Sequence, residues 1–117
     1  GIMGRGRITM QPDSQAIERL VQRIVETVHP LRIILFGSAA RGEMGPDSDV
    51  DVLVVMPEGT HRRHTAQFIY TRLVGLDLPF GVDVLVATAE DLDRYRDDIG
   101  FIYYDALREG REVYATA

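Results

Sequence analysis

Two periodicities of apolar residues alternate along this chain and predict its elements. Over residues 13–28 the apolar side chains recur every three or four positions, which is typical of a helix with one buried face. Asp13 is the expected N-terminal cap, and His29 followed by Pro30 is the expected end, because the residue before proline avoids the helical conformation. The residues on the apolar face are Ile17, Leu20, Val21, Ile24, Val25 and Val28.

Short continuous apolar runs follow this helix and predict buried strands. The runs cover residues 33–36, 50–56 and 82–86, and a shorter strand is expected at 113–114. In the second run, Val50, Val52 and Val54 face the side opposite to Asp49 and Asp51, because successive side chains of a strand point to opposite faces. The two aspartates are therefore expected to share one face of the sheet.

Helical spacing returns in three later segments. The first runs from Thr60 to about Leu76. Its expected buried residues are Ala66, Ile69, Tyr70, Leu73 and Val74. Thr88 and Asp91 have the spacing of a capping box, which predicts the start of the second helix. The third helix is expected over residues 101–109, with Gly110 as its stop.

The order of these elements indicates an α/β (α+β) fold, in which a small mixed β-sheet carries helices packed on one face. The link between the first two strands, residues 37–49, is too short for an ordinary helical crossover, so these strands are expected to pair antiparallel. The length of 117 residues suits one domain. We expect residues 1–12 to be a flexible leader, with Gly1 and Ile2 a cloning remnant, and residues 13–117 to form the domain.

The amino-acid composition excludes several classes of function. All 13 basic residues are arginine, which excludes a P-loop lysine and Schiff-base chemistry. The 18 acidic residues give a net charge of −5, which disfavours binding to nucleic acid. Cysteine is absent, and no apolar run approaches the roughly 20 residues that cross a bilayer. Nothing near the N-terminus resembles a secretory signal, so a cytoplasmic location is expected.

Three aspartates carry the candidate chemistry. Asp49 and Asp51 stand two positions apart on one strand, roughly 6.5–7 Å along it, and Asp83 lies in the next apolar run. Carboxylates with substrate phosphate suit Mg²⁺, and a pair of such ions stabilises the attacking and leaving oxygens of a displacement at phosphorus. We therefore expect Asp49 and Asp51 to bridge two metals, and Asp83 to hold the catalytic metal and orient or deprotonate the incoming hydroxyl.

Gly37 and Ser38 follow the first strand and can offer backbone N–H groups and a hydroxyl to the β- and γ-phosphates of a nucleotide. Arg41 in the same turn either contacts phosphate or pairs with a nearby acid. A simpler interpretation of Asp49 and Asp51 is turn chemistry before a strand. Their spacing from Gly37 and Ser38 favours the metal site.

A further polar cluster, His61-Arg62-Arg63-His64, invites a phosphate or metal interpretation. Neither histidine has an obvious acidic partner nearby in the sequence. We therefore expect this segment to be the solvated first turn of the helix that follows.

These residues resemble a known family. Gly37-Ser38, ten intervening residues and then Asp49-x-Asp51 is the signature of the DNA polymerase beta-like nucleotidyltransferase superfamily. The segment Leu35–Val54 and the tail Asp105–Tyr114 are similar to the minimal (MNT) branch of that superfamily, and the resemblance spans most of residues 13–115. Members often carry an arginine where this chain has Ala39, so Arg41 is the arginine that remains in the turn.

The resemblance implies the DNA polymerase beta-like fold and a transfer of nucleoside monophosphate from ATP or another NTP to a hydroxyl. It implies Asp49, Asp51 and Asp83 as catalytic and metal-binding residues for two Mg²⁺ ions, with Mn²⁺ as an alternative. Many minimal members are antitoxins that attach AMP to a tyrosine of a helical HEPN toxin, so a HEPN partner is expected. The alternatives are a subunit that masks such a partner without catalysis and transfer to a small molecule such as an aminoglycoside. The aromatic residues Phe101, Tyr103 and Tyr104 suggest an oligomer contact.

Overall fold

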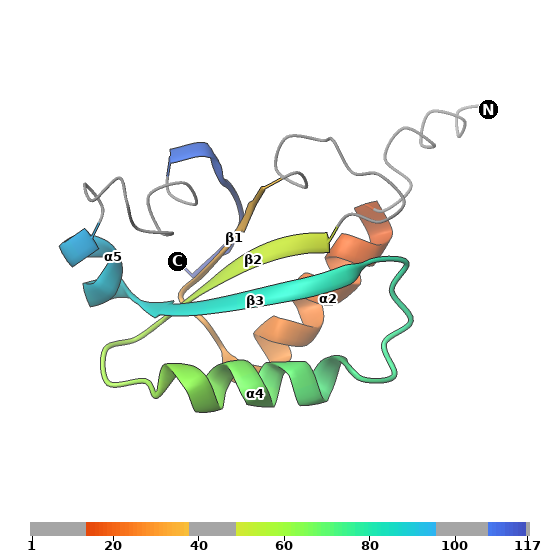
Figure 1. Ribbon diagram of the computed structural model, residues 1–117, viewed down its shortest axis with the longest axis horizontal. Helices are drawn as coiled ribbons and strands as arrows, with labels where there is room; N and C mark the ends of the chain where they lie inside the picture. The colour runs from red at the N-terminus through yellow and green to blue at the C-terminus, as the bar shows by residue number, and fades with distance from the viewer. Residues whose placement is uncertain (1–13, 38–48, 96–107, 117) are drawn as a thin grey trace.

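The computed structural model describes residues 14–37, 49–95 and 108–116. Its elements in chain order are α2 (Ser14–Val28), β1 (Arg32–Phe36), β2 (Asp49–Met56), α4 (Arg62–Leu73), β3 (Gly81–Thr88), α5 (Ala89–Tyr95) and β4 (Arg111–Ala115) (Figure 1). The expected leader at 1–12 lies outside the described residues. So does the helix expected at 101–109, except for Arg108 and Glu109, which are helical.

The four strands form one mixed sheet in the order β3-β2-β1-β4. β1 runs antiparallel to both β2 and β4, whereas β2 and β3 are parallel. The antiparallel pairing expected from the short link between the first two strands is therefore confirmed. Parallel pairing of β2 and β3 is possible because the long connection through α4 returns the chain to the same end of the sheet.

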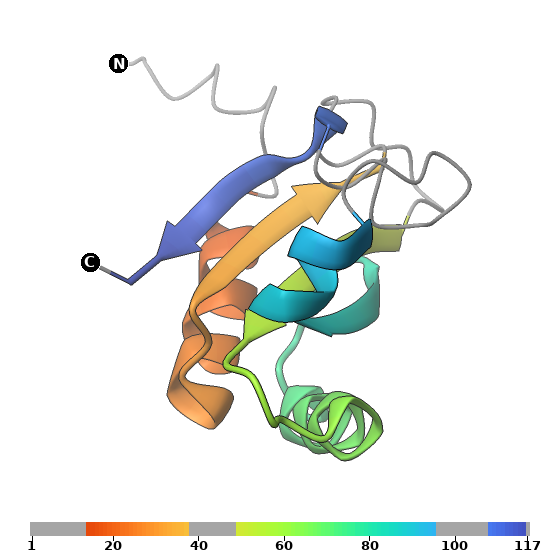
Figure 2. The same cartoon turned by 90° about the vertical axis from the view of Figure 1, so that its left-hand side faces the viewer.

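Helices α2 and α4 cover one face of the sheet, as expected (Figure 2). The core beneath them is formed by alternate residues of the strands and by the inner faces of the two helices. Its fully buried members include Leu20, Ile24, Ile33, Leu35, Val50, Val52, Val54 and Ile69. The apolar face predicted for residues 13–28 therefore packs on the sheet, and burial of this stripe rather than helix propensity stabilises α2.

Helix α5 lies on the opposite face, which the prediction of helices on one face did not include. It buries Leu92 against a second, smaller core that contains Ile34, Leu53, Val55 and Ala87. The physical reason is that β2 is apolar on both faces after Asp51. The second half of this strand must therefore be shielded from water by helices on both faces of the sheet. In Figure 1, α5 follows the end of β3. Asp49 and Asp51, in contrast, belong to the beginning of β2.

Helix α4 is shorter than predicted, and part of its expected apolar stripe is exposed. It ends at Leu73, because Val74 is already extended and is 80% exposed. Tyr70 is 42% exposed, and its hydroxyl oxygen accepts a hydrogen bond from the backbone N–H of Val84 at the outer edge of β3 (2.8 Å). Ile69 is buried as predicted. No helix in the described part of the chain is long and apolar enough to cross a membrane.

Candidate active site

Asp49, Asp51 and Asp83 lie on the same face of the sheet. Asp49 and Asp51 alternate with the buried valines of β2, so both point away from the core beneath α2 and α4. Asp83 is paired directly with Asp51 in the parallel register, and directly paired residues of neighbouring strands project to the same side. The fold thus brings together three carboxylates at the beginning of two adjacent strands, although Asp83 follows Asp49 by 34 residues in the sequence.

Two glycines border these carboxylates. Gly37 follows the end of β1 with a positive φ of 71°, a conformation that side chains rarely adopt. A Cβ atom built on Gly37 would overlap Oδ2 of Asp51, and one built on Gly81 would lie 2.5 Å from Oδ1 of Asp49. Gly37 was selected from the sequence, whereas Gly81 was not. The sequence does contain one indication of Gly81: it precedes Asp83 by two residues, just as Asp49 precedes Asp51.

The electrostatics of the three aspartates reflect their closeness. Partial burial raises the pKa of Asp51 above its usual 3.8, and the negative charges of Asp83 and then Asp49 raise it further. Both neighbours are exposed, whereas Asp51 is half-buried between them. A cation placed here would be attracted by all three groups and would relieve their repulsion.

The residues fit a divalent cation whose coordination is completed by phosphate and water. Within residues 14–37, 49–95 and 108–116, no three histidine, aspartate or glutamate side chains converge closely enough to hold a metal ion by themselves. The donors are carboxylate oxygens, which Mg²⁺ prefers, and Mg²⁺ usually keeps waters and substrate oxygens among its ligands. The carboxylates of Asp51 and Asp49 lie where a Cβ atom would stand at Gly37 and Gly81, so the two glycines leave room for them.

Ser38 and Arg41, the other predicted nucleotide-binding residues, lie outside the described residues. Gly37 is the last described position before them, and it stands beside Asp51. Their predicted contacts with phosphate therefore stay predictions.

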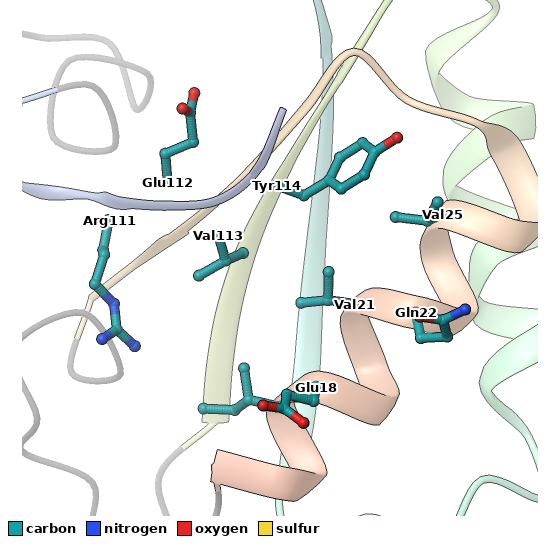
Figure 3. A pocket seen from close by; sticks show the side chains of 9 residues that line it. Glu18, Val21, Gln22, Val25, Arg111, Glu112, Val113 and Tyr114 are labelled. Atoms are coloured by element: carbon teal, nitrogen blue, oxygen red, sulfur yellow. The ribbon is translucent and has the colours of Figure 1, made fainter. Parts of the chain in front are cut away.

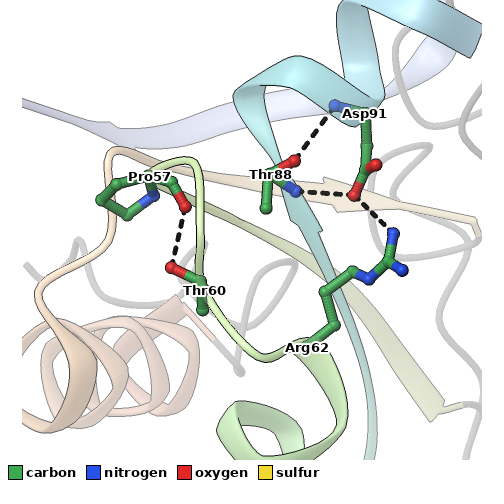
Figure 4. Close-up of polar contacts among 5 residues, drawn as sticks. All are labelled: Pro57, Thr60, Arg62, Thr88 and Asp91. Atoms are coloured by element: carbon green, nitrogen blue, oxygen red, sulfur yellow. Dashed lines mark hydrogen bonds and ion pairs between the residues drawn. The ribbon is translucent and has the colours of Figure 1, made fainter.

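A second polar cluster, formed by Thr88, Asp91 and Arg62, stabilises the fold at the other end of β3 (Figure 4). The Thr88 N–H donates to Oδ2 of Asp91 (3.1 Å), and the Asp91 N–H donates to the Thr88 hydroxyl (3.1 Å), which confirms the capping box. Burial alone would raise the pKa of Asp91. The hydrogen bonds from Thr88 and Arg62 and the charge of Arg62, whose Nη1 lies 2.7 Å from Oδ2, outweigh burial and lower this pKa below 3.8.

The polar run at 61–64 is exposed, as predicted. His61 is the N-terminal cap of α4, and its Nδ1 accepts the N–H of His64 (3.2 Å) while the two rings stack at 3.8 Å. Sequence reasoning missed the ion pair that joins Arg62 to Asp91, since the partners are 29 residues apart.

A cavity of about 680 Å³ opens between α2 and the edge strand β4 (Figure 3). Its walls carry apolar side chains from α2, together with Glu18 on α2 and Arg111 on β4. None of the three aspartates lines it, so the cavity is separate from the candidate active site.

A small mixed sheet with carboxylates at the beginning of two parallel strands, beside a glycine turn, defines the nucleotidyltransferase class of fold. A profile described as "Nucleotidyltransferase domain" matches residues 16–113. The chain belongs to this nucleotidyltransferase domain family.

Solved structures agree on the fold. A candidate nucleotidyltransferase from Sulfolobus solfataricus superposes with a TM-score of 0.62 at 19% identity, covering 96% of this chain and 89% of that one. A chain from a toxin–antitoxin structure with AMP-PNP gives a TM-score of 0.56 at 20% identity, covering 85% of this chain and 73% of that one. No curated protein matches the sequence. At these identities the likeness confirms the nucleotidyltransferase fold predicted from the sequence.

Proposed function

We propose that this protein is a metal-dependent nucleotidyltransferase that moves a nucleoside monophosphate, AMP from ATP, to a hydroxyl group. The observation that carries the proposal is the gathering of Asp49, Asp51 and Asp83 on one face of the sheet beside Gly37. Membership of the nucleotidyltransferase domain family supports it. So does the raised pKa of Asp51, which is expected where carboxylates are held together for a cation.

Each residue has a proposed part in the transfer. Asp49, Asp51 and Asp83 would hold two Mg²⁺ or Mn²⁺ ions, which neutralise the triphosphate and polarise the reacting oxygens. Gly37, Ser38 and Arg41 would hold the β- and γ-phosphates. The acceptor oxygen forms a bond to the α-phosphorus, the bond from that phosphorus to pyrophosphate breaks, and the hydroxyl proton passes to the Asp83 carboxylate. Positioning and electrostatic stabilisation would supply most of the rate.

We further propose that the acceptor is a tyrosine of a HEPN toxin and that the protein acts as its antitoxin. The fold similarity to a chain from a toxin–antitoxin structure with AMP-PNP supports this role. The exposed position of Asp49 and Asp83 also supports a protein acceptor, because a bulky partner can reach carboxylates that stand open on a sheet. The alternative is a subunit that masks such a partner without catalysing transfer.

Calorimetry with ATP and Mg²⁺ tests nucleotide binding. The wild-type protein should bind ATP when Mg²⁺ is present and lose that binding in EDTA, because the carboxylates and the triphosphate repel each other without the cation. Asp49→Ala should abolish the Mg²⁺-dependent binding. Glu58→Gln is the matched control, since it removes one exposed negative charge from a turn outside the site. Equal affinity in wild type and Asp49→Ala would refute the site.

Incubation with α-labelled ATP and a HEPN partner tests the transfer. The label should appear on the partner, and it should be lost when the acceptor tyrosine is changed to phenylalanine. Asp83→Asn should retain some nucleotide affinity and lose transfer, because the hydroxyl proton then has no carboxylate to receive it. Tight binding of the partner without label would favour the masking role. Label on an aminoglycoside rather than on the partner would favour the small-molecule alternative.

A further inference from the structure

We infer that Gly81 is a positioning residue of the candidate active site, and that the absence of a side chain there keeps the Asp49 carboxylate in place. The inference rests on the proposed function, because it concerns the same carboxylates. It adds a residue that stands outside the Gly37-Ser38 and Asp49-x-Asp51 motifs. Gly81 would touch neither metal nor nucleotide and would act through Asp49.

The geometry is specific. Gly81 is the first residue of β3, and the parallel register pairs it directly with Asp49, the first residue of β2. A Cβ atom at position 81 would lie 2.5 Å from Oδ1 of Asp49, 3.2 Å from Cγ and 3.8 Å from Oδ2. The Asp49 side chain therefore leans over the position where any other residue would place its first carbon. The three heavy atoms nearest to such a Cβ all belong to Asp49, so the carboxylate is the first group that a side chain at position 81 would meet.

Backbone conformation does not explain this glycine. Gly37, Gly59 and Gly75 have φ values of 71°, 90° and 89°, which favour glycine on their own account. Gly81 lies outside this left-handed range and belongs to an extended strand. Glycine within a strand weakens it, because it loses more conformational freedom on folding and offers no side chain for packing. Close approach of the Asp49 carboxylate is the feature that accounts for it.

A side chain at position 81 should therefore disturb the site and spare the fold. Asp49 is exposed, so its carboxylate can turn towards solvent at little cost when a methyl group takes its place. Asp51 and Asp83 would then remain paired without the third carboxylate. The cation would be held by these carboxylates together. A small displacement of the Asp49 carboxylate should therefore weaken cation binding, although all three aspartates are still present.

Titration of the full chain with Mn²⁺ and ATP in a fixed 1:1 ratio, followed by the enhancement of the water-proton relaxation rate that protein-bound Mn²⁺ causes, tests the inference without any measurement of activity. ATP is included because phosphate oxygens and water complete the coordination that the carboxylates begin. Gly81→Ala should bind Mn²⁺ about 10- to 100-fold more weakly than wild type, which is the usual effect of losing a group that orients a metal ligand. Its thermal midpoint should be equal or higher, because alanine is compatible with an extended backbone and restricts the unfolded chain. An unchanged Mn²⁺ affinity would overturn the inference.

Two further variants separate positioning from general damage. Gly59→Ala places alanine in a left-handed turn with no neighbour within 4 Å, so it should lower the thermal midpoint and leave Mn²⁺ binding unchanged. In the Asp49→Asn background, Gly81→Ala should cause no additional loss of Mn²⁺ affinity, because its effect passes through the Asp49 carboxylate. Additive losses in the double variant would contradict that route.

The same titrations distinguish the two proposals. If Asp49→Asn binds Mn²⁺ more weakly than wild type and Gly81→Ala binds it as wild type does, the role of Gly81 is refuted and the proposed function stands. If wild type and Asp49→Asn bind Mn²⁺ equally, the three carboxylates are not a metal site. The proposed function then fails, and the role of Gly81 fails with it.

Discussion

Replacing Asp51 with asparagine should stabilise the metal-free protein. Asp51 is half-buried between two like charges, and the pKa of its carboxyl is raised. The folded protein therefore holds a proton on Asp51 more tightly than the unfolded chain does, so ionisation of this group costs stability. The cost grows as the pH rises from 3.8 through the raised pKa, and it is complete at neutral pH. Asparagine has nearly the same shape and carries no charge.

Partial burial is the first cause of this cost, and the repulsion from Asp83 and Asp49 adds to it by an amount that follows from the register. Asp83 is the direct neighbour across parallel strands about 4.8 Å apart, and Asp49 is about 6.5–7 Å along the same strand. Two unit charges about 4 Å apart in water interact by about 1 kcal/mol, and solvent screens these partly exposed groups to less than that. With partial burial and both neighbours taken together, Asp51→Asn should add about 1 kcal/mol to the free energy of unfolding, or about 3–5 °C in thermal midpoint.

The order of stabilities should reverse when metal and nucleotide are added. Urea unfolding in EDTA should rank Asp51→Asn above wild type. With Mg²⁺ and ATP at about 100 times their dissociation constant, wild type should gain about 2.7 kcal/mol and overtake the variant, whose site is impaired. Glu58→Gln, which removes one negative charge as Asp51→Asn does, should stay within about 0.5 kcal/mol of wild type under both conditions. An Asp51→Asn protein less stable than wild type in EDTA would refute the reasoning.

Two structural predictions concern the other polar contacts. Asp91→Ala should cost about 2 kcal/mol, because it removes the carboxylate half of the capping box and the ion pair with Arg62, and leaves the buried N–H of Thr88 unpaired. Since the pKa of Asp91 is lowered, this stabilisation should be present above pH 3.8 and disappear as acid titration passes the lowered pKa, and a loss on the alkaline side instead would contradict it. Tyr70→Phe should cost about 1 kcal/mol and speed amide hydrogen exchange at Val84, the group that donates to its hydroxyl; unchanged exchange would mean that this bond does not protect the strand edge.

Much of the site was predictable, because its residues obey local rules. The alternation of valine and aspartate in β2 places Asp49 and Asp51 on one face whatever the rest of the fold does. The short link after β1 predicts antiparallel pairing with the next strand, and the spacing of Thr88 and Asp91 predicts a capping box. In each case the relevant residues lie close together in the sequence, so the local pattern determines the contact.

The missed features depend on contacts between distant residues. The role of Gly81 becomes visible only once β2 and β3 are in register, since the glycine itself has an ordinary strand conformation. The exposure of Tyr70 follows from the edge of β3, whose free N–H group recruits a hydroxyl that helical spacing assigns to the core. The position of α5 follows from the second apolar face of β2, which matters only when strands on both sides of it are in place.

Because side chains alternate between the two faces of a strand, the candidate site depends on the number of residues that precede Asp83 in β3. Adding one residue inside β3 between positions 81 and 83 would turn the third carboxylate towards the layer under α2 and α4, where Val82 and Val84 now pack. The same addition in the turn at 75–80 would leave every strand position in its place. Related chains should therefore differ in length freely in that turn and hardly at all within the opening residues of the strand, because an added residue there would separate the third carboxylate from the other two.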